Sequence, residues 1–245
     1  MNVKRVILMV SKNIIFAPVW FTQMVLYGRD SDKHTVEERF SLLKKITVHA
    51  NKAGRVIIKA NGLENLPKED GFIMFPNHQG LFDVLAFIES CDHPFTVVMK
   101  KEIQNIFFLK QVFGVMRARA LDREDVKQAM RVILSMADDV KKGINYVIFA
   151  EGTRSKNGNK VGEFKGGSFK SALKAKCPIV PVAIVDSFKP FDTNSTKPVT
   201  VQVHYMKPLY YEDYKDLKSI EIANLVQKMI QDKINESTGI DYRES

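Results

Sequence analysis

A histidine and an aspartate stand five positions apart in the stretch 75–83, whose sequence is FPNHQGLFD. An apolar strand is expected to end at Phe75, and a proline and a glycine then favour a turn. His78 would therefore lie at the end of a strand, where ligand clefts open in α/β sheets. Asp83 would occupy the first turn of the next helix, where the helix dipole stabilises a carboxylate.

This pair could supply a general base. A carboxylate bonded to one imidazole nitrogen fixes the tautomer and leaves the other nitrogen free to take a proton. The chain contains no G-x-S-x-G nucleophile elbow. We therefore expect the nucleophile to be a hydroxyl that the substrate carries. The other histidines are interpreted as ordinary surface or core residues; they are His34, His49, His93 and His204.

Glycine-bearing turns and cations follow other predicted strands. In the stretch 149–155, FAEGTRS, the amides of Gly152 and Thr153 and the guanidinium of Arg154 would form a phosphate cradle. Lys165 precedes two glycines that open a helix, where exposed amides attract an anion.

Further cations follow the other predicted strands. Lys100 belongs to a lysine pair, and Arg123 ends the stretch LDR. Singly, each of these cations could be a solvated surface charge. Together, at strand ends and near a histidine–aspartate pair, they favour an anion-binding site.

The composition narrows the class of protein. Of 245 residues, 45% are hydrophobic and 27% are charged, which is ordinary for a globular chain with one core and excludes a wholly disordered one. The net charge of +9 suits an anionic partner: nucleic acid, a lipid surface or a phosphorylated substrate. The chain lacks the aromatic and basic pattern of a nucleic-acid module, so no nucleic-acid partner is expected. Cys91 and Cys177 are far apart and outside any metal-binding pattern, so we expect two buried thiols and no bound metal.

The hydrophobic pattern alternates between strands and helices. It predicts an α/β fold with a mixed, largely parallel central sheet flanked by helices. Predicted strands cover 56–60, 72–75, 95–99, 146–150, 179–185 and 199–205, and predicted helices cover 36–51, 81–89, 125–142, 168–176 and 220–235. We expect an α/β domain over 51–245, preceded by an N-terminal helical membrane-association segment over 1–50.

The N-terminal segment is apolar, but Lys12 divides it. The uncharged stretch 13–28 is shorter than the ~20 residues of a membrane-spanning helix, and it contains a proline. Its aromatic residues and the nearby cations are typical of an amphipathic helix in a membrane interface. These residues are Trp20, Phe21 and Tyr27 with Lys4, Arg5, Lys12 and Arg29. The alternative is a helix that packs on the core.

At these motifs the chain resembles the glycerophospholipid acyltransferases, in particular the bacterial 1-acyl-sn-glycerol-3-phosphate acyltransferases. The resemblance runs from about residue 55 to 208 and covers four blocks in the family's order, 77–83, 121–123, 151–154 and 179–182. It implies that His78 is the base and that Asp83 orients it. It also implies that the acceptor phosphate is bound by Arg123, Glu151, Gly152, Thr153 and Arg154, with Lys100 and Lys165 also in family order.

The chain departs from the family pattern at three places. Ala150 stands where a proline is common, and Gly80 replaces a common serine. The glycine of the second block lies nine residues before Arg123 instead of six. Arg117 and Arg119 are therefore further candidates for the phosphate contact, and Arg123 is the expected one.

The resemblance implies acyl transfer from acyl-CoA or acyl-carrier protein to the sn-2 hydroxyl of lysophosphatidic acid, which gives phosphatidic acid. It requires no cofactor and no metal. The expected location is the cytoplasmic face of the cell membrane, peripheral or monotopic, in contact with an anionic membrane surface. Two alternatives remain: an acyltransferase acting on another lysophospholipid or lipid acceptor, and a non-enzymatic basic protein that docks on membranes.

Overall fold

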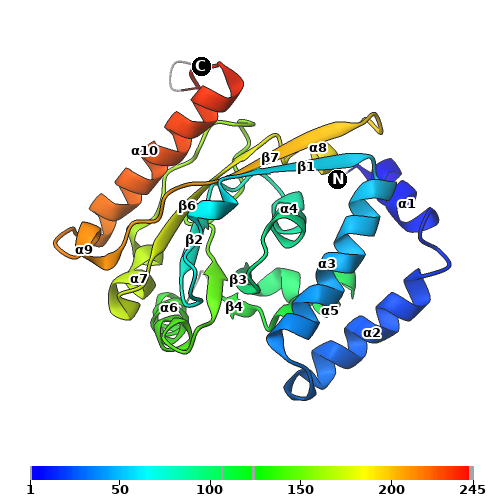
Figure 1. Ribbon diagram of the computed structural model, residues 1–245, viewed down its shortest axis with the longest axis horizontal. Helices are drawn as coiled ribbons and strands as arrows, with labels where there is room; N and C mark the ends of the chain where they lie inside the picture. Colours follow the sequence, from blue (N-terminus) through cyan, green and yellow to red (C-terminus); the bar gives the residue numbers. More distant parts are fainter. Residues whose placement is uncertain (1, 106, 123–124, 243–245) are drawn as a thin grey trace.

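Seven strands form one sheet in the order β1-β7-β6-β2-β5-β3-β4 within the residues that the computed structural model describes, 2–105, 107–122 and 125–242 (Figure 1). Every neighbouring pair is parallel except β6 and β7. The predicted mixed, largely parallel sheet is therefore confirmed. The strands are β1 (Val56–Asn61), β2 (Ile73–Pro76), β3 (Phe95–Lys100), β4 (Arg119–Leu121), β5 (Asn145–Val147), β6 (Ile179–Val185) and β7 (Val199–Tyr205).

Helices cover both faces of the sheet (Figure 1). One face packs against α3 (Val36–Ala53), α4 (Phe82–Ser90) and α5 (Phe107–Met116). The other face packs against α6 (Val126–Val140), α7 (Lys170–Ala175) and α10 (Ser219–Thr238). The remaining helical elements are α1 (Val3–Ser11), α2 (Ala17–Arg29), α8 (Lys189–Asp192), α9 (Tyr211–Tyr214) and the short 3-10 turns η1 (Ser31–Lys33), η2 (Leu63–Asn65), η3 (Lys101–Asn105) and η4 (Gly166–Phe169).

Strand β6 shows why the sheet has two cores. All seven of its residues are buried, as expected for a continuous apolar run in a sheet covered on both faces. Val182 and Ile184 enter the core beneath α3, α4 and α5. Ala183 and Val185, which point the other way because strand side chains alternate, enter the core beneath α6, α7 and α10.

Two elements between residues 100 and 121 were not predicted. The sequence of α5, FFLKQVFGVM, is apolar on nearly every side, so its periodicity does not distinguish a helix from a strand. Strand β4 has only three residues and pairs at the edge of the sheet with β3. A strand this short depends on its neighbour rather than on its own pattern.

The N-terminal apolar stretch forms two helices. Pro18 lies in the first turn of α2, a position that proline tolerates, so it begins this helix instead of breaking a longer one. Among the described helices, none combines the length and the hydropathy that crossing a bilayer requires. Seven apolar side chains on α1, on α2 and in the turn between them are each more than half exposed: Val3, Ile7, Val10, Ile14, Ile15, Phe16 and Val19.

Two residues that the sequence placed at the membrane interface lie elsewhere. Trp20 is buried, stacked on Phe16 and edge-on to His49. Arg5 is 1% exposed and faces the protein interior. Both predictions were wrong because residue type alone does not reveal which face of a short helix packs inward. Membrane contact by this segment remains a prediction.

Candidate active site

Five parallel strands end at one edge of the sheet, and the predicted site residues follow them. Because β6, β2, β5, β3 and β4 run in the same direction, their carboxyl ends meet there. His78 follows β2, Gly152 follows β5, and Lys100 is the last residue of β3. Arg123 follows β4 and lies outside the described residues. This edge is where ligands bind in open α/β sheets.

His78 and Asp83 are in direct contact. Nδ1 of His78 lies 2.7 Å from Oδ2 of Asp83. The aspartate is fully buried, and the histidine side chain is 18% exposed. If the carboxylate accepts the Nδ1 proton, the lone pair resides on Nε2. The geometry therefore suits a general base at the rim of the site.

Backbone amides fix the position of Asp83. Its Oδ2 also accepts hydrogen bonds from the amides of Gln79, at 2.7 Å, and Gly80, at 3.0 Å. Asp83 lies in the first turn of α4, as predicted. The same oxygen thus meets three donors from residues 78–80, so the turn and the carboxylate hold each other.

The loop after β5 holds the backbone of His78 from the other side. The amide of His78 donates to Oε1 of Glu151 at 2.7 Å, and its carbonyl accepts from the amide of Ser155, also at 2.7 Å. The ring of Phe149 lies 4.2 Å from the imidazole, centroid to centroid. Contacts on both polar backbone groups and on one ring face restrict the imidazole.

Glu151, expected among the phosphate-binding residues, lies beneath the loop of residues 77–83, which carries His78. It is buried, and its second oxygen accepts from the amide of Gly162 at 3.1 Å. A Cβ at position 162 would lie 2.5 Å from that oxygen, so only glycine fits there. Burial raises the pKa of Glu151 to about 7, against the opposing effect of the two amides. Both carboxylate oxygens are used by backbone donors, which points to positioning of His78 rather than to a phosphate contact.

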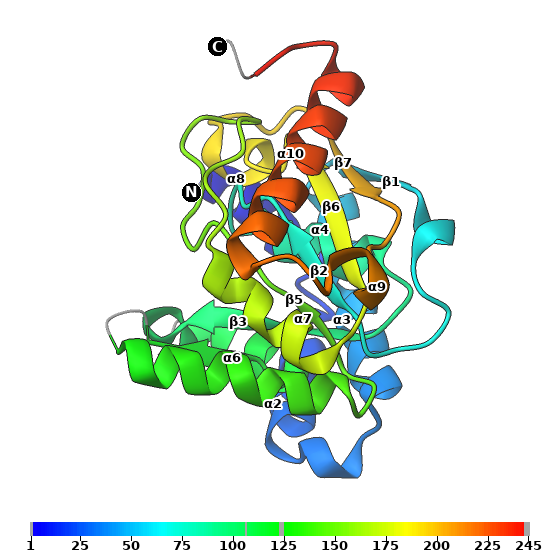
Figure 2. The same cartoon turned by 90° about the vertical axis from the view of Figure 1, so that its left-hand side faces the viewer.

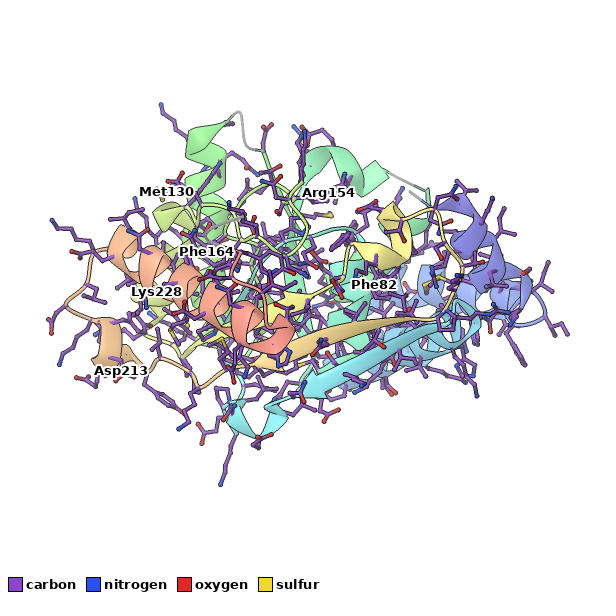
Figure 3. The ribbon with its side chains drawn as sticks, turned by 90° about the horizontal axis from the view of Figure 1, so that it is seen from above. Phe82, Met130, Arg154, Phe164, Asp213 and Lys228 are labelled. Atoms are coloured by element: carbon purple, nitrogen blue, oxygen red, sulfur yellow. The ribbon has the colours of Figure 1, made fainter. Side chains whose placement is uncertain are left out.

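The remaining residues of the expected phosphate cradle are half-buried or exposed. Gly152 has a φ of +70°, and a Cβ there would lie 3.3 Å from Nζ of Lys165, whose side chain passes over it. Thr153 and Arg154 are exposed. In Figure 3, Arg154 and Phe82 of α4 lie near the middle of the molecule, and Lys228 and Asp213 lie toward its left end. Lys100 forms an ion pair with Glu102 at 3.0 Å.

Two of the three candidate arginines near β4 are occupied. Arg117 is paired with Asp32. Arg119 is paired with Asp139 and donates to the hydroxyl of Tyr146 at 2.9 Å. The pair of Arg119 is partly buried, whereas the pair of Arg117 lies at the surface, with Asp32 almost fully exposed. Arg123 stays the expected phosphate residue of this segment.

Two amide side chains beside His78 have structural roles that the sequence did not predict. Asn77 pairs with the backbone of Ile184, accepting from its amide at 2.7 Å and donating to its carbonyl at 2.9 Å. Gln79 donates to Asn159 at 2.7 Å and accepts from the amide of Ser187 at 2.7 Å. Both side chains join the loop of residues 77–83 to the end of β6. The only sequence signal was two amides flanking the histidine.

The two cysteines are free and buried, as predicted. Burial raises the pKa of Cys91 to about 11 and that of Cys177 to about 12. Neither thiol is therefore an available nucleophile at neutral pH. Across the part of the chain that the structure describes, no three histidine, cysteine, aspartate or glutamate side chains are grouped to hold a metal ion.

A family model described as Acyltransferase matches residues 57–185, which run from the second residue of β1 to the end of β6 and include the histidine–aspartate pair. The chain belongs to the acyltransferase family. It is an enzyme, so the non-enzymatic alternative is set aside, and the resemblance predicted from the motifs is confirmed.

Curated proteins that are similar to this chain are also named as acyltransferases. The chain is 33% identical over 186 residues to a 1-acyl-sn-glycerol-3-phosphate acyltransferase of Borreliella burgdorferi, covering 74% of this chain and 71% of the relative. A 1-acyl-sn-glycerol-3-phosphate acyltransferase of Cocos nucifera is 28% identical over 164 residues, which cover 66% of this chain and about half, 53%, of the longer relative. The crystal structure of the 1-acyl-sn-glycerophosphate acyltransferase PlsC from Thermotoga maritima is similar with a TM-score of 0.75. It is 22% identical, and the match covers 97% of this chain and 98% of that one, so it supports the fold.

Proposed function

We propose that this acyltransferase moves a fatty acyl group from a thioester donor to the sn-2 hydroxyl of lysophosphatidic acid, forming phosphatidic acid. The observation that carries the proposal is the 2.7 Å contact between His78 and Asp83 at the sheet edge where the phosphate-cradle residues also lie. The names of the curated relatives support the acceptor.

The proposed reaction passes through one tetrahedral intermediate. Nε2 of His78 takes the proton of the acceptor hydroxyl as its oxygen attacks the thioester carbonyl. Asp83 stabilises the imidazolium that forms, because its carboxylate is already bonded to Nδ1. The intermediate then collapses, the carbon–sulfur bond breaks, and the imidazolium returns the proton to the thiolate. The products are an ester and a free thiol.

We assign the acceptor phosphate to the amide of Thr153 and the guanidinium of Arg154. Gly152 provides the positive φ of this turn, and its own amide donates to the carbonyl of Phe149 at 3.1 Å. Lys165 would add a second charge, since its side chain passes over Gly152. Arg123 and Lys100 follow neighbouring strands and are proposed to complete the binding of the anion. Cations and exposed amides at strand ends are the groups that bind phosphate in such folds.

We propose acyl-CoA or acyl-carrier protein as the donor. Both are anionic, which suits a chain of net charge +9. Thioester transfer by a histidine base requires no cofactor.

We further propose that residues 1–50 rest on the cytoplasmic face of the membrane as a peripheral or monotopic segment. The seven exposed apolar side chains on α1, on α2 and in their connecting turn form a surface of the kind that marks an interaction site. Lys4, Lys12 and Arg29 are exposed beside it and would meet anionic headgroups. A lipid surface fits this arrangement because the acceptor is itself an anionic amphiphile.

Release of free thiol tests the function. Purified protein is mixed with palmitoyl-CoA or palmitoyl-carrier protein and with lysophosphatidic acid, lysophosphatidylethanolamine or glycerol 3-phosphate. We expect lysophosphatidic acid to be the best acceptor, and His78→Ala to lose about 10²–10⁴ in turnover. Faster turnover of another acceptor would replace the proposed substrate.

The chain offers a matched control. His93 also lies 2.7 Å from an aspartate, Asp70, but it precedes β3, at the opposite edge of the sheet. His93→Ala removes an equivalent pair outside the site and should retain turnover. If His78→Ala keeps more than about a tenth of the activity while folding normally, His78 is not the base.

A further inference from the structure

A buried arginine at the start of α1 joins three separate segments. The guanidinium of Arg5 donates to the carbonyl of Gly54 at 2.5 Å, and to those of Ser195 at 2.6 Å and Lys197 at 2.9 Å. Gly54 caps the carboxyl end of α3, and the other two acceptors lie between α8 and β7. One side chain therefore fixes α1 against two distant parts of the fold.

Asn2 strengthens the same connection. Its side-chain amide donates at 2.7 Å to the carbonyls of both Thr193 and Ser195. Its backbone amide donates to the carbonyl of Phe191 in α8. Figures 1 and 2 both show the N-terminus beside α8.

The burial of Arg5 is energetically costly. Within the described residues no carboxylate forms an ion pair with it, and its Nε atom has no hydrogen-bond partner. Burial, and secondarily the charge of Arg55, lower the pKa of Arg5. A cation that lacks a counter-ion is expensive to bury. The three carbonyls that accept from its guanidinium offset part of this cost and fix α1 to the rest of the fold.

Helix α8 touches the loop of residues 77–83. The ring of Phe191 packs edge-on against Phe82 at 5.3 Å between centroids, and Phe82 is the residue before Asp83. A Cβ at Gly80 would lie 3.4 Å from a carboxylate oxygen of Asp192. Thus α8 packs on the residues whose amides and first helical turn orient the aspartate.

Hydrogen bonds carry much of the junction between α1 and α8. An open pocket of about 290 Å³ is lined by residues 2–4 and 191–194. Apolar packing therefore does not fill this junction. The outer face of α1 presents Val3, Ile7 and Val10 to the surroundings, while Arg5 lies on its inner face.

We propose that Asn2 and Arg5 are positioning residues that fix the catalytic loop, residues 77–83, relative to the lipid surface on which α1 rests. This inference depends on the proposed function. A lipid acceptor held in a bilayer reaches His78 only when α1, α8 and the loop keep their positions relative to one another. An acceptor dispersed in water reaches the site without that constraint.

The experiment compares two lysophosphatidic acids that share a headgroup and differ in the length of the acyl chain. Thiol release is measured with oleoyl-lysophosphatidic acid in vesicles of phosphatidylglycerol and phosphatidylcholine, and with hexanoyl-lysophosphatidic acid dispersed as monomers. For Arg5→Lys we expect turnover on vesicles to fall about tenfold or more, with less than about a twofold change on the dispersed acceptor. Vesicle binding, measured by sedimentation, should not change. Arg55→Lys, the same substitution at an exposed neighbour, should leave both activities unchanged.

Equal losses on both acceptors would overturn the inference, because they indicate a general structural role. Unchanged activity on vesicles, or a parallel loss of vesicle binding, would overturn it as well. If Arg5→Lys does not fold, Asn2→Ala carries the same expectation. It removes three hydrogen bonds without altering a buried charge: those to the carbonyls of Thr193 and Ser195, and the one that its oxygen accepts from the amide of Arg5. A wild-type protein that releases thiol from neither acceptor would instead refute the proposed function, which is a distinguishable result.

Discussion

Asp83 and Arg5 are both buried ionisable residues held by backbone groups, but their partners come from very different distances along the chain. Asp83 meets the amides of Gln79 and Gly80, within four residues of itself. Arg5 meets carbonyls at Gly54, Ser195 and Lys197, at least 49 residues away. Local turn geometry determines the first arrangement, whereas the second exists only when the whole sheet has formed.

Asp83 and Arg5 also differ in the chemical groups that hold them. A carboxylate at the start of a helix is stabilised by unpaired amides and by the helix dipole. A cation near the end of a helix is stabilised by unpaired carbonyls, as Arg5 is by the capping residue of α3. Asp83 has an additional partner in His78, and its expected role is chemical. Arg5 has only carbonyl partners among its hydrogen bonds, and its expected role is to hold segments together.

The largest expected effect is on turnover, for Asp83→Asn. Nδ1 of His78 and the two amides all approach one oxygen of Asp83. An asparagine oxygen in that place keeps these contacts but has no negative charge to stabilise the imidazolium, and an NH₂ group there would oppose both amides. We expect thiol release to fall about 10²–10⁴-fold while the fold is kept. Circular dichroism and urea unfolding are the checks on folding. A fall of less than about tenfold would mean that the aspartate only supports the turn.

The second largest effect is expected for Arg5→Met, which should lower the stability of the folded protein. The buried carbonyl of Gly54 and the partly buried contact at Lys197 lose the arginine donor, while the carbonyl of Ser195 keeps Asn2. Loss of the buried charge offsets only part of this cost. We expect the free energy of unfolding to fall by about 2–4 kcal/mol in urea denaturation. An unchanged or higher stability would show that the buried cation is the greater cost, as is known for some buried ion pairs.

Glu151 combines features of both residues, because it is a buried acid held by amides from two distant segments. Its pKa is raised to about 7 by burial, so the folded protein holds this proton more tightly than the unfolded chain does. The resulting contribution to stability is complete below about pH 4.5 and is lost as pH rises to about 7, by roughly 3 kcal/mol in all. Glu151→Gln should remove this pH dependence. The difference in unfolding free energy between the two proteins should therefore change between these pH values, and a constant difference would contradict the raised pKa.

The smallest expected effect concerns the exposed Arg154. Its removal leaves the buried framework intact, so Arg154→Ala should raise the acceptor KM about 10–100-fold, far more than it raises the donor KM. Glu151→Gln should instead lower kcat, because its contacts are with the His78 loop. Equal increases in the two KM values for Arg154→Ala would remove it from the phosphate site.

Much of the fold could be predicted because its elements carry strong local patterns. The predicted limits of β6 and β7 agree with the structure, and α3 and α6 begin at capping residues visible in the sequence, Thr35 and Asp125. Helix α5 and strand β4 were missed because one is apolar on nearly every side and the other is only three residues long. Arg5 was placed on the wrong face because α1 turns Val3, Ile7 and Val10 outward and packs Arg5 inward, the reverse of the usual orientation of an apolar face. Trp20 was misplaced because α2 is apolar on most sides and has no pattern that identifies its inner face.

The sequence by itself determined the α/β class, the contact between His78 and Asp83, and the glycine turn after β5, since each depends on residues within a few positions of one another. Only the tertiary structure decided that Glu151 supports the backbone of His78, that Arg117 and Arg119 are occupied, and that Arg5 points inward. These features depend on which strands become neighbours in the sheet. That order arises from the packing of the two cores, which no local stretch of residues specifies.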